Sequence, residues 1–149
     1  MLYHLRGSLT RKTPTYVVVD CGGLGYLVHI SLTTFGQLPE AGAVELLLHP
    51  VYREDAQLLF GFATELEREV FVLLNSVSGV GASTARVILS TLRPEEALSV
   101  LANGDSGTLQ RIKGIGAKTA QRIIVDLRDK AVKLGATSSA MPMGTTARH

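Results

Sequence analysis

One pattern occurs twice in the sequence, as VSGVGASTARVILSTL at residues 77–92 and as IKGIGAKTAQRIIVDL at residues 112–127. The two segments align without a gap. In each copy a Gly-apolar-Gly triplet precedes small residues and then apolar residues at the spacing of a helix. Glycines permit a tight turn, and the first turn of a helix has amide groups without a partner in the helix. The repeat therefore predicts two turns that each lead into a helix with an anion-binding N-terminus.

Each turn could be a simple corner between two packed helices, with Val80 and Ile115 as buried plugs. A corner alone does not require the same glycines, the same small residues and the same plug twice. Both copies resemble the helix-hairpin-helix motif, which binds duplex DNA without reading its sequence. In that motif the amides of the hairpin and of the second helix contact backbone phosphates. The candidate DNA contacts are Ser78, Gly79, Val80, Gly81, Ala82, Ser83 and Thr84 in the first hairpin, and Lys113, Gly114, Ile115, Gly116, Ala117, Lys118 and Thr119 in the second.

Positive charge gathers on the second copy, although the net charge of the chain is only +2. Residues 110–122 contain Arg111, Lys113, Lys118 and Arg122 and no acidic residue. The position of Lys118 is occupied by Ser83 in the first copy, and a hydroxyl releases no counterion when it contacts a phosphate. We therefore expect the first hairpin to contribute less to the salt dependence of DNA binding. Arg86 and Arg122 are expected to be solvated surface residues.

The first 63 residues have the pattern of a small β-barrel. Five runs rich in Val, Leu and Tyr are separated by turn signals such as Gly22-Gly23. A short helical segment, SLTTFGQL at residues 31–38, lies between the third and fourth runs, with Ser31 or Thr33 as its N-cap. This order predicts an OB-fold at residues 1–63, a fold that often binds nucleic acid.

From Thr64 onward the apolar spacing is helical. Thr64 and Glu67 form a capping-box pair, and Pro94 marks the first turn of another helix. We expect an all-α domain at residues 64–134, with two helix-hairpin-helix motifs and a last helix from Ala117 to about Leu134. Residues 135–149 are small, polar and unpatterned, which predicts a flexible tail or linker. The predicted fold class is therefore α+β and multidomain, an OB-fold barrel followed by an all-α domain.

Composition excludes several classes of function. With 46% hydrophobic residues the chain can bury a core, but it has no apolar run long enough to cross a membrane and no signal peptide pattern, so we expect a cytoplasmic protein that does not bind membranes. The single cysteine, Cys21, can form no intramolecular disulfide, and the four histidines have no ligand-like spacing. We expect no metal and no cofactor.

Two adjacent acidic residues, Glu54 and Asp55, stand in the segment REDAQLLFGF at a predicted hairpin tip. Such residues are usually solvated turn residues. In a protein expected to bind DNA they are unusual, because carboxylates repel phosphates.

Several separated motifs closely resemble the RuvA family of bacterial proteins that bind Holliday junctions. They are LRGSL, GGLGYLVHISLTTF, LPEAG, REDAQLLFGF and GIGAKTAQRIIVDLRDK, together with the GVG and GIG hairpins, and the resemblance covers about residues 1–134. It implies a homotetramer, or an octamer of two face-to-face tetramers, that holds a four-way junction open and square-planar in recombination, DNA repair and the SOS response. Glu54 and Asp55 fall on the acidic pin of the family, near the junction centre, where their charge would repel phosphates and help to separate strands.

The resemblance also implies partners. The family acts with the hexameric ATPase RuvB, which pumps the DNA, and with the nuclease RuvC, which resolves the junction. This chain has no GxxxxGK[ST] phosphate-binding loop, so ATP is expected to be used by the motor and no intrinsic catalysis is expected. The family continues past a flexible linker into a small third helical domain that contacts the motor, and residues 135–149 look like that linker.

Two other functions stay open on the residues alone. A helix-hairpin-helix glycosylase or nuclease subunit would need catalytic acids, for which Asp105, Asp126 and Asp129 are the nearest candidates. A single-strand binder built on the barrel would need exposed aromatic residues, yet only 5% of the chain is aromatic and Phe60 and Phe62 are expected in the core.

Overall fold

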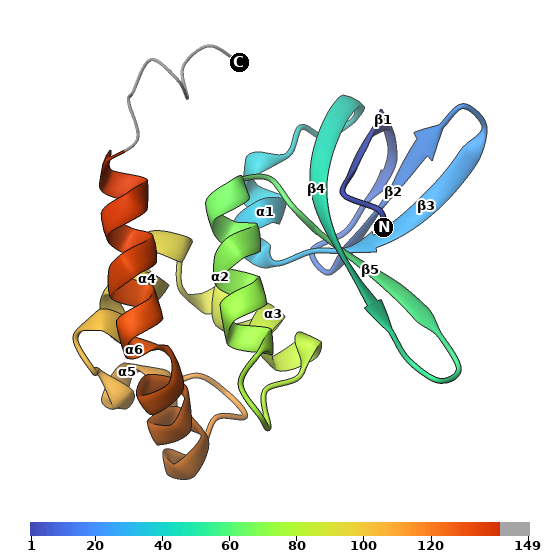
Figure 1. Cartoon of the computed structure of the whole chain (residues 1–149). Coiled ribbons are helices and arrows are strands. Elements are labelled where there is room, and N and C mark those ends of the chain that lie inside the picture. Colours follow the sequence, from blue (N-terminus) through green and yellow to red (C-terminus); the bar gives the residue numbers. More distant parts are fainter. Residues whose placement is uncertain (141–149) are drawn as a thin grey trace.

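The computed structural model describes residues 1–140 of the chain, and side chains through residue 137. Residues 1–62 form a closed five-stranded barrel in the order β1-β2-β3-β5-β4 (Figure 1). Its strands are β1 (His4–Lys12), β2 (Tyr16–Cys21), β3 (Leu24–His29), β4 (Gly42–Tyr52) and β5 (Gln57–Phe62). This arrangement confirms the predicted OB-fold.

The barrel closes because its strands have one apolar face and pair in register. Val17 and Val19 of β2 are fully buried, and Leu46 and Leu48 of β4 alternate with less buried neighbours in the same way. Antiparallel pairs join β1 to β2 and β4, β2 to β3, and β4 to β5. A parallel contact between β3 and β5, with His29 opposite Phe60, completes the ring.

The short helix α1 (Leu32–Gln37) lies between β3 and β4, as the sequence predicts. Ser31 is its N-cap, since the Ser31 hydroxyl accepts a hydrogen bond from the Thr34 amide at 3.1 Å. Thr33, the other candidate, lies inside the helix. Figure 1 shows α1 on the side of the barrel that faces the helices.

In the described part of the chain, five further helices follow the barrel. They are α2 (Glu65–Asn75), α3 (Ala82–Thr91), α4 (Pro94–Ala102), α5 (Ser106–Gln110) and α6 (Ala117–Ala140). Their starts follow from local chemistry: the Thr64 hydroxyl caps α2, Pro94 opens α4, and the Asp105 carboxylate accepts from the Thr108 amide at 3.1 Å to cap α5.

The helices share a core with the barrel. Phe60 and Phe62 of β5 pack against Phe71 of α2, with ring centroids 5.2 and 4.9 Å apart. These aromatic side chains belong to the same buried cluster as Ile88 of α3 and Ile123 of α6. A second cluster of buried residues, which includes Val17 and Leu46, fills the barrel itself. Strand β5 is therefore common to both halves of the molecule.

Two expectations about the helices are corrected. Thr64 caps α2 as predicted, but the Glu67 carboxylate does not complete a capping box, because it accepts hydrogen bonds from Ser31 and Thr34 of the barrel instead. The last helix does not end at about Leu134. Helix α6 continues through residues 135–140, since each residue added to a helix that has already formed gains a hydrogen bond. The rest of the expected tail, residues 141–149, lies outside the described residues.

A search of the described helices finds none that combines the length and the apolar character needed to cross a bilayer.

His49 gives the fold a pH dependence. Burial lowers the pKa of His49 from its ordinary value of 6.5, and the nearby Arg68 guanidinium lowers it further. The Nδ1 atom of this ring is buried without a hydrogen-bond partner, and the ring meets Phe71 edge-on at 5.6 Å. The folded protein therefore binds the proton less tightly than the unfolded chain does. This contribution to stability is complete above about pH 6.5 and is lost as the pH falls toward the folded pKa.

We expect the His49→Gln variant to lose less stability than the natural protein between pH 7.5 and pH 5, because it removes this proton uptake. The measurement is the free energy of unfolding in urea at several pH values. His4→Gln, at an exposed position of β1, serves as the control and should keep the natural slope. An identical slope in His49→Gln and His4→Gln would contradict the assignment.

Candidate nucleic-acid interface

The two repeated turns have the same backbone geometry. Gly79 and Gly114 both have a φ of 90°, a conformation that L side chains rarely adopt. The next residue closes each turn with a similar hydrogen bond, from the Val80 amide to the Val77 carbonyl at 2.9 Å and from the Ile115 amide to the Ile112 carbonyl at 3.1 Å. The sequence repeat is thus a structural repeat, with one turn between α2 and α3 and the other between α5 and α6.

The apolar residue of each turn is buried in the hydrophobic core, as predicted. Val80 is 4% exposed and Ile115 is 5% exposed, and both join the helical core. Their side chains cannot reach a ligand. Ala82 is also buried, so these three candidate residues can offer only main-chain atoms to DNA.

The second glycine of each turn is not required by the fold. Gly81 has an extended backbone, with φ −82° and ψ 172°, that any residue adopts, and Gly116 does not have a positive φ. Apart from its neighbours in the chain, a Cβ atom added at Gly81 or Gly116 would meet no atom of the described residues within 4 Å. The absence of a side chain therefore leaves open space in front of each turn, through which another molecule can approach the backbone.

Both glycines stand at the start of a helix. The Gly81 carbonyl accepts from the Ala85 amide and the Gly116 carbonyl accepts from the Ala120 amide, each at 3.0 Å. No side chain caps α3, so the first amides of that helix have no side-chain partner. Partial positive charge at a helix N-terminus adds to these donors. The arrangement can bind an anion with main-chain groups alone.

The remaining candidate residues differ in exposure. Ser78, Ser83, Lys113, Ala117 and Lys118 are exposed, whereas Thr84 and Thr119 are half-buried in the first turns of α3 and α6. Arg111, Lys113 and Lys118 have no acidic side chain within 4 Å among residues 1–140. Arg122 is exposed as expected, and its Nε lies 3.9 Å from Asp126. The second hairpin therefore presents more uncompensated positive charge than the first.

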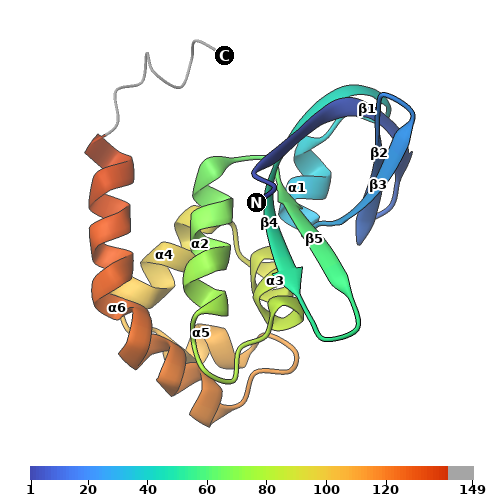
Figure 2. The same ribbon diagram turned by 45° about the vertical axis from the view of Figure 1, so that its right-hand side comes forward.

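The acidic pair lies at the tip of the β4–β5 hairpin. Glu54 and Asp55 are exposed, and the turn is closed by the Arg53 amide, which donates to the Ala56 carbonyl at 2.7 Å. Figures 1 and 2 show that this tip and the two helical turns project toward the same end of the molecule. The structure thus brings acidic groups and main-chain anion sites to one side.

Arg86 is not a solvated surface residue, which corrects the expectation from the sequence. It is half-buried on α3, and its Nη1 donates to the carbonyl oxygens of Thr15 at 3.0 Å and Ile30 at 3.4 Å. The side chain therefore joins the first hairpin to the barrel. Its Nη1 group is therefore engaged within the protein and holds the guanidinium against the barrel.

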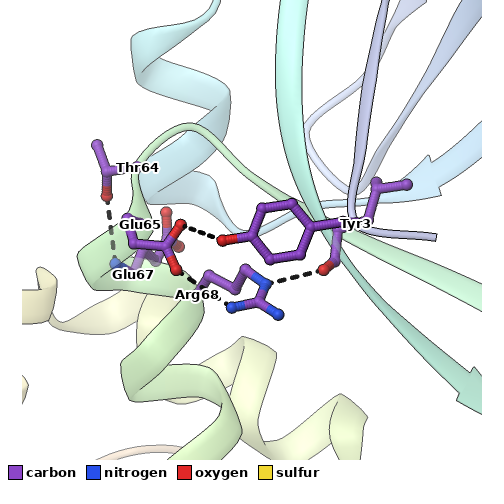
Figure 3. A network of polar contacts seen from close by, with 6 residues as sticks. Tyr3, Thr64, Glu65, Glu67 and Arg68 are labelled. Carbon is purple, nitrogen blue, oxygen red and sulfur yellow. Dashed lines mark hydrogen bonds and ion pairs between the residues drawn. The ribbon is translucent and has the colours of Figure 1, made fainter. Parts of the chain in front are cut away.

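A polar network at the start of α2 also joins helices and barrel (Figure 3). The Tyr3 hydroxyl donates to Glu65 at 3.2 Å, and the Arg68 guanidinium lies over the Tyr3 ring at 4.7 Å. Arg68 also pairs with Glu65 at 3.2 Å and donates to the Leu48 carbonyl of β4 at 2.9 Å. The local sequence pattern does not predict these contacts, because most of them join residues far apart in the chain.

The structure offers little for the two other functions. Asp105 caps α5, and its hydrogen bonds with Thr108 lower its pKa, while Asp126 lies beside Arg122. Within residues 1–140 no three His, Cys, Asp or Glu side chains are grouped so as to hold a metal ion. Phe60 and Phe62 are buried at 3% and 1% exposure, so they cannot stack on bases.

Comparison with known proteins agrees with this architecture. Residues 1–61 match the RuvA N terminal domain, and residues 71–129 match the SAM-like Helix-hairpin-helix tandem. The chain is 53% identical over 134 residues to a protein of Christiangramia forsetii, a match that covers 90% of this chain and 69% of the relative. It is 47% identical over 137 residues to one of Bacteroides thetaiotaomicron, covering 92% and 68%. A protein of Pelobacter propionicus is 43% identical over 142 residues, covering 95% and 72%.

Each of these relatives is named Holliday junction branch migration complex subunit RuvA. The two matched ranges, 1–61 and 71–129, contain the barrel with its acidic tip and both hairpins of this chain. On this identity and coverage, the chain belongs to the RuvA family.

Proposed function

We propose that this chain binds four-way (Holliday) junction DNA in a structure-specific and sequence-independent way, as the DNA-binding subunit of a branch migration complex. Membership of the RuvA family and the names of its relatives support this function. The main structural support is the open space at Gly81 and Gly116, which leaves the first amides of α3 and α6 accessible. The fold itself does not need glycine at either position. Contacts from main-chain amides to phosphates give affinity without base reading.

In this function the residues of the two hairpins have defined roles. The amides that follow Gly81 and Gly116 bind backbone phosphates, Lys113 and Lys118 add point charges, and the hydroxyls of Ser83, Thr84 and Thr119 donate hydrogen bonds. Glu54 and Asp55 form an acidic pin that repels phosphates near the crossover and helps to separate strands. Attraction at the hairpins and repulsion at the pin together hold the junction open.

The assembly follows from the same proposal. A homotetramer with four-fold symmetry places one protomer on each arm of an open, square-planar junction, and an octamer encloses the junction between two such tetramers. A RuvB ATPase supplies the energy for branch migration, and a RuvC nuclease resolves the junction. The chain itself binds no cofactor and acts in the cytoplasm. Family resemblance supports these partners.

The first prediction from this proposed function compares three DNA substrates in a gel-shift titration. The natural protein should bind a four-way junction more tightly than the linear duplex of one arm, and the duplex more tightly than single strands. Equal affinity for all three substrates would contradict the proposed function.

The Gly116→Ser variant should bind junction and duplex about tenfold more weakly, irrespective of sequence, because its Cβ fills the space in front of the amides.

Serine is a favourable residue at a helix start, so the free energy of unfolding of Gly116→Ser should change by less than about 0.5 kcal/mol. Gly36→Ser is the matched control, since a Cβ at Gly36 also meets no atom within 4 Å but lies on α1. Its DNA affinity should be that of the natural protein. Unchanged DNA affinity in Gly116→Ser would show that the second hairpin is only a corner.

The second prediction concerns the salt dependence of duplex binding. Lys118→Gln should reduce the slope of log affinity against log salt by about 0.9, the value for one released phosphate contact. Ser83→Ala, at the equivalent position of the first hairpin, should leave the slope unchanged. Equal slopes for Lys118→Gln and the natural protein would remove Lys118 from the interface.

The third prediction tests the acidic pin. The double variant Glu54→Gln/Asp55→Asn should bind the junction at least as tightly as the natural protein, because it removes repulsion, while base pairs at the crossover open less. Crossover opening is measured by permanganate reactivity of thymines placed there. Glu40→Gln, at an exposed acidic position of the barrel, is the control and should change neither readout. A marked loss of junction affinity in the pin variant would contradict the repulsion.

A further inference from the structure

The contact between the barrel and the first hairpin is polar and directional. We call it the dock and define it as Ser31, Thr33 and Thr34 of the barrel with Glu67, Arg86 and Ser90 of the helices. Ser31, Thr34 and Glu67 are at most 1% exposed. A carboxylate at full burial is costly unless hydrogen bonds compensate its lost hydration, so this group needs its partners.

The hydroxyl groups of Ser31 and Thr34 both donate their proton to the Glu67 carboxylate. The Ser31 hydroxyl accepts from the Thr34 amide at 3.1 Å, and the Thr34 hydroxyl accepts from the Ala63 amide at 3.1 Å. The single proton of each hydroxyl is therefore directed to the carboxylate, from Ser31 to Oε2 and from Thr34 to Oε1, the latter at 2.6 Å. Burial raises the pKa of Glu67 above its ordinary value, and these two hydrogen bonds oppose the rise. The geometry suits an ionised carboxylate that fixes α1 against α2.

Helix α3 is fixed to the same small helix. The Thr33 hydroxyl donates to the Leu89 carbonyl at 2.6 Å, and the Leu32 amide donates to the Ser90 hydroxyl at 3.0 Å. Arg86 adds its bonds to the carbonyls of Thr15 and Ile30. Both helices of the first hairpin are thus bonded to the barrel. Within residues 1–140 no hydrogen bond joins α5 or α6, which form the second hairpin, to the barrel.

The barrel also contains the β4–β5 hairpin with its acidic tip. The dock is therefore a polar link between the first DNA-binding turn and the acidic pair, in addition to the bond from Arg68 of α2 to the Leu48 carbonyl of β4. Packing of Phe60 and Phe62 on Phe71 holds the two halves together, but apolar contact is not directional. Hydrogen bonds are directional, so the dock sets the angle at which the halves meet.

We infer that the dock residues are positioning residues for junction recognition, which set the angle between the first hairpin and the acidic tip and so determine the preference for a four-way junction over a linear duplex. The inference rests on the proposed function. A linear duplex needs only the hairpin surface. A junction needs the hairpin on an arm and the tip at the crossover at the same time, so it is sensitive to the angle between them.

The test uses the full chain with two dock hydroxyls removed, Thr34→Val/Ser90→Ala. Thr34→Val keeps the side-chain volume but leaves the Ala63 amide and one Glu67 oxygen without this partner, and Ser90→Ala removes the acceptor of the Leu32 amide. The matched control is Thr10→Val/Thr91→Ala. These two hydroxyls are exposed and bond within the barrel and within α3. Thr34→Ser/Ser90→Thr keeps both hydroxyls and tests rescue.

Junction and duplex affinities are measured for each protein under conditions where thermal unfolding shows all variants to be folded. We expect the dock variant to keep its duplex affinity within about twofold and to lose about tenfold in junction affinity, because the hairpin and the tip no longer meet the arm and the crossover at the required angle. The control and the rescue variant should keep both. A dock variant with unchanged junction preference, or with equal losses on both substrates, would overturn the inference.

A distance measurement tests the angle directly. Spin labels at Ala56→Cys, beside the acidic tip, and at Val87→Cys, exposed on α3, report the separation of tip and hairpin helix in a Cys21→Ser background. The distance distribution should shift or broaden in the dock variant and stay narrow in the control. An unchanged distribution would also overturn the inference. If the natural protein itself shows no junction preference, the proposed function fails, and the distance measurement still shows whether the dock sets the angle.

Discussion

The structure depends on the packing of Phe60 and Phe62 of β5 against Phe71 of α2. Burying each of these side chains contributes about 1.5–3 kcal/mol relative to exposure. Because β5 pairs with β4 in the barrel and also packs in the helical core, neither half can lose this strand without losing part of its own core. The barrel and the helices are therefore parts of one folded unit, within which the polar contacts between the two halves form.

Opposite charges are separated within that frame. Within residues 1–140 no acidic side chain pairs with Lys113 or Lys118 of the second hairpin, whereas Glu54 and Asp55 lie at the end of a different element. A uniformly basic surface would pull all phosphates of a junction toward one another at the crossover. In the proposed function, acidic groups at a defined distance from basic ones oppose that collapse. Geometry, more than net charge, then determines what the protein does to DNA.

Local patterns in the sequence predicted most of the elements and the candidate site. The strand runs, the N-cap at Ser31, the Pro94 helix start and the two glycine turns all depend on near neighbours in the chain. The partners of Glu67 and Arg86 could not be predicted in this way, since they lie in the barrel. One signal was present for Glu67: it falls at helical spacing from Val70, Phe71 and Leu74, which places it on the buried face of α2.

The C-terminal end of α6 could not be predicted from the sequence for a different reason. Residues 135–140 have weak helical preference and include Gly135, so composition favoured a tail. A helix already formed extends at little cost, because each added residue gains one hydrogen bond, whereas starting a helix requires several residues to be ordered first. Continuation of a long, packed helix such as α6 therefore depends less on the preference of its last residues than on the turns before them.

The turn between α2 and α3, where the backbone is accessible at Gly81, would bind an anion through main-chain amides alone. Main-chain amides do not titrate between pH 5 and 9, do not oxidise, and have no side-chain rotamers to order on binding. Their orientation is set when the chain folds, so the entropic cost of arranging the donors belongs to folding and not to association. A site of this kind is insensitive to acidity and to redox state. Substitutions alter its strength chiefly by blocking the approach to the backbone.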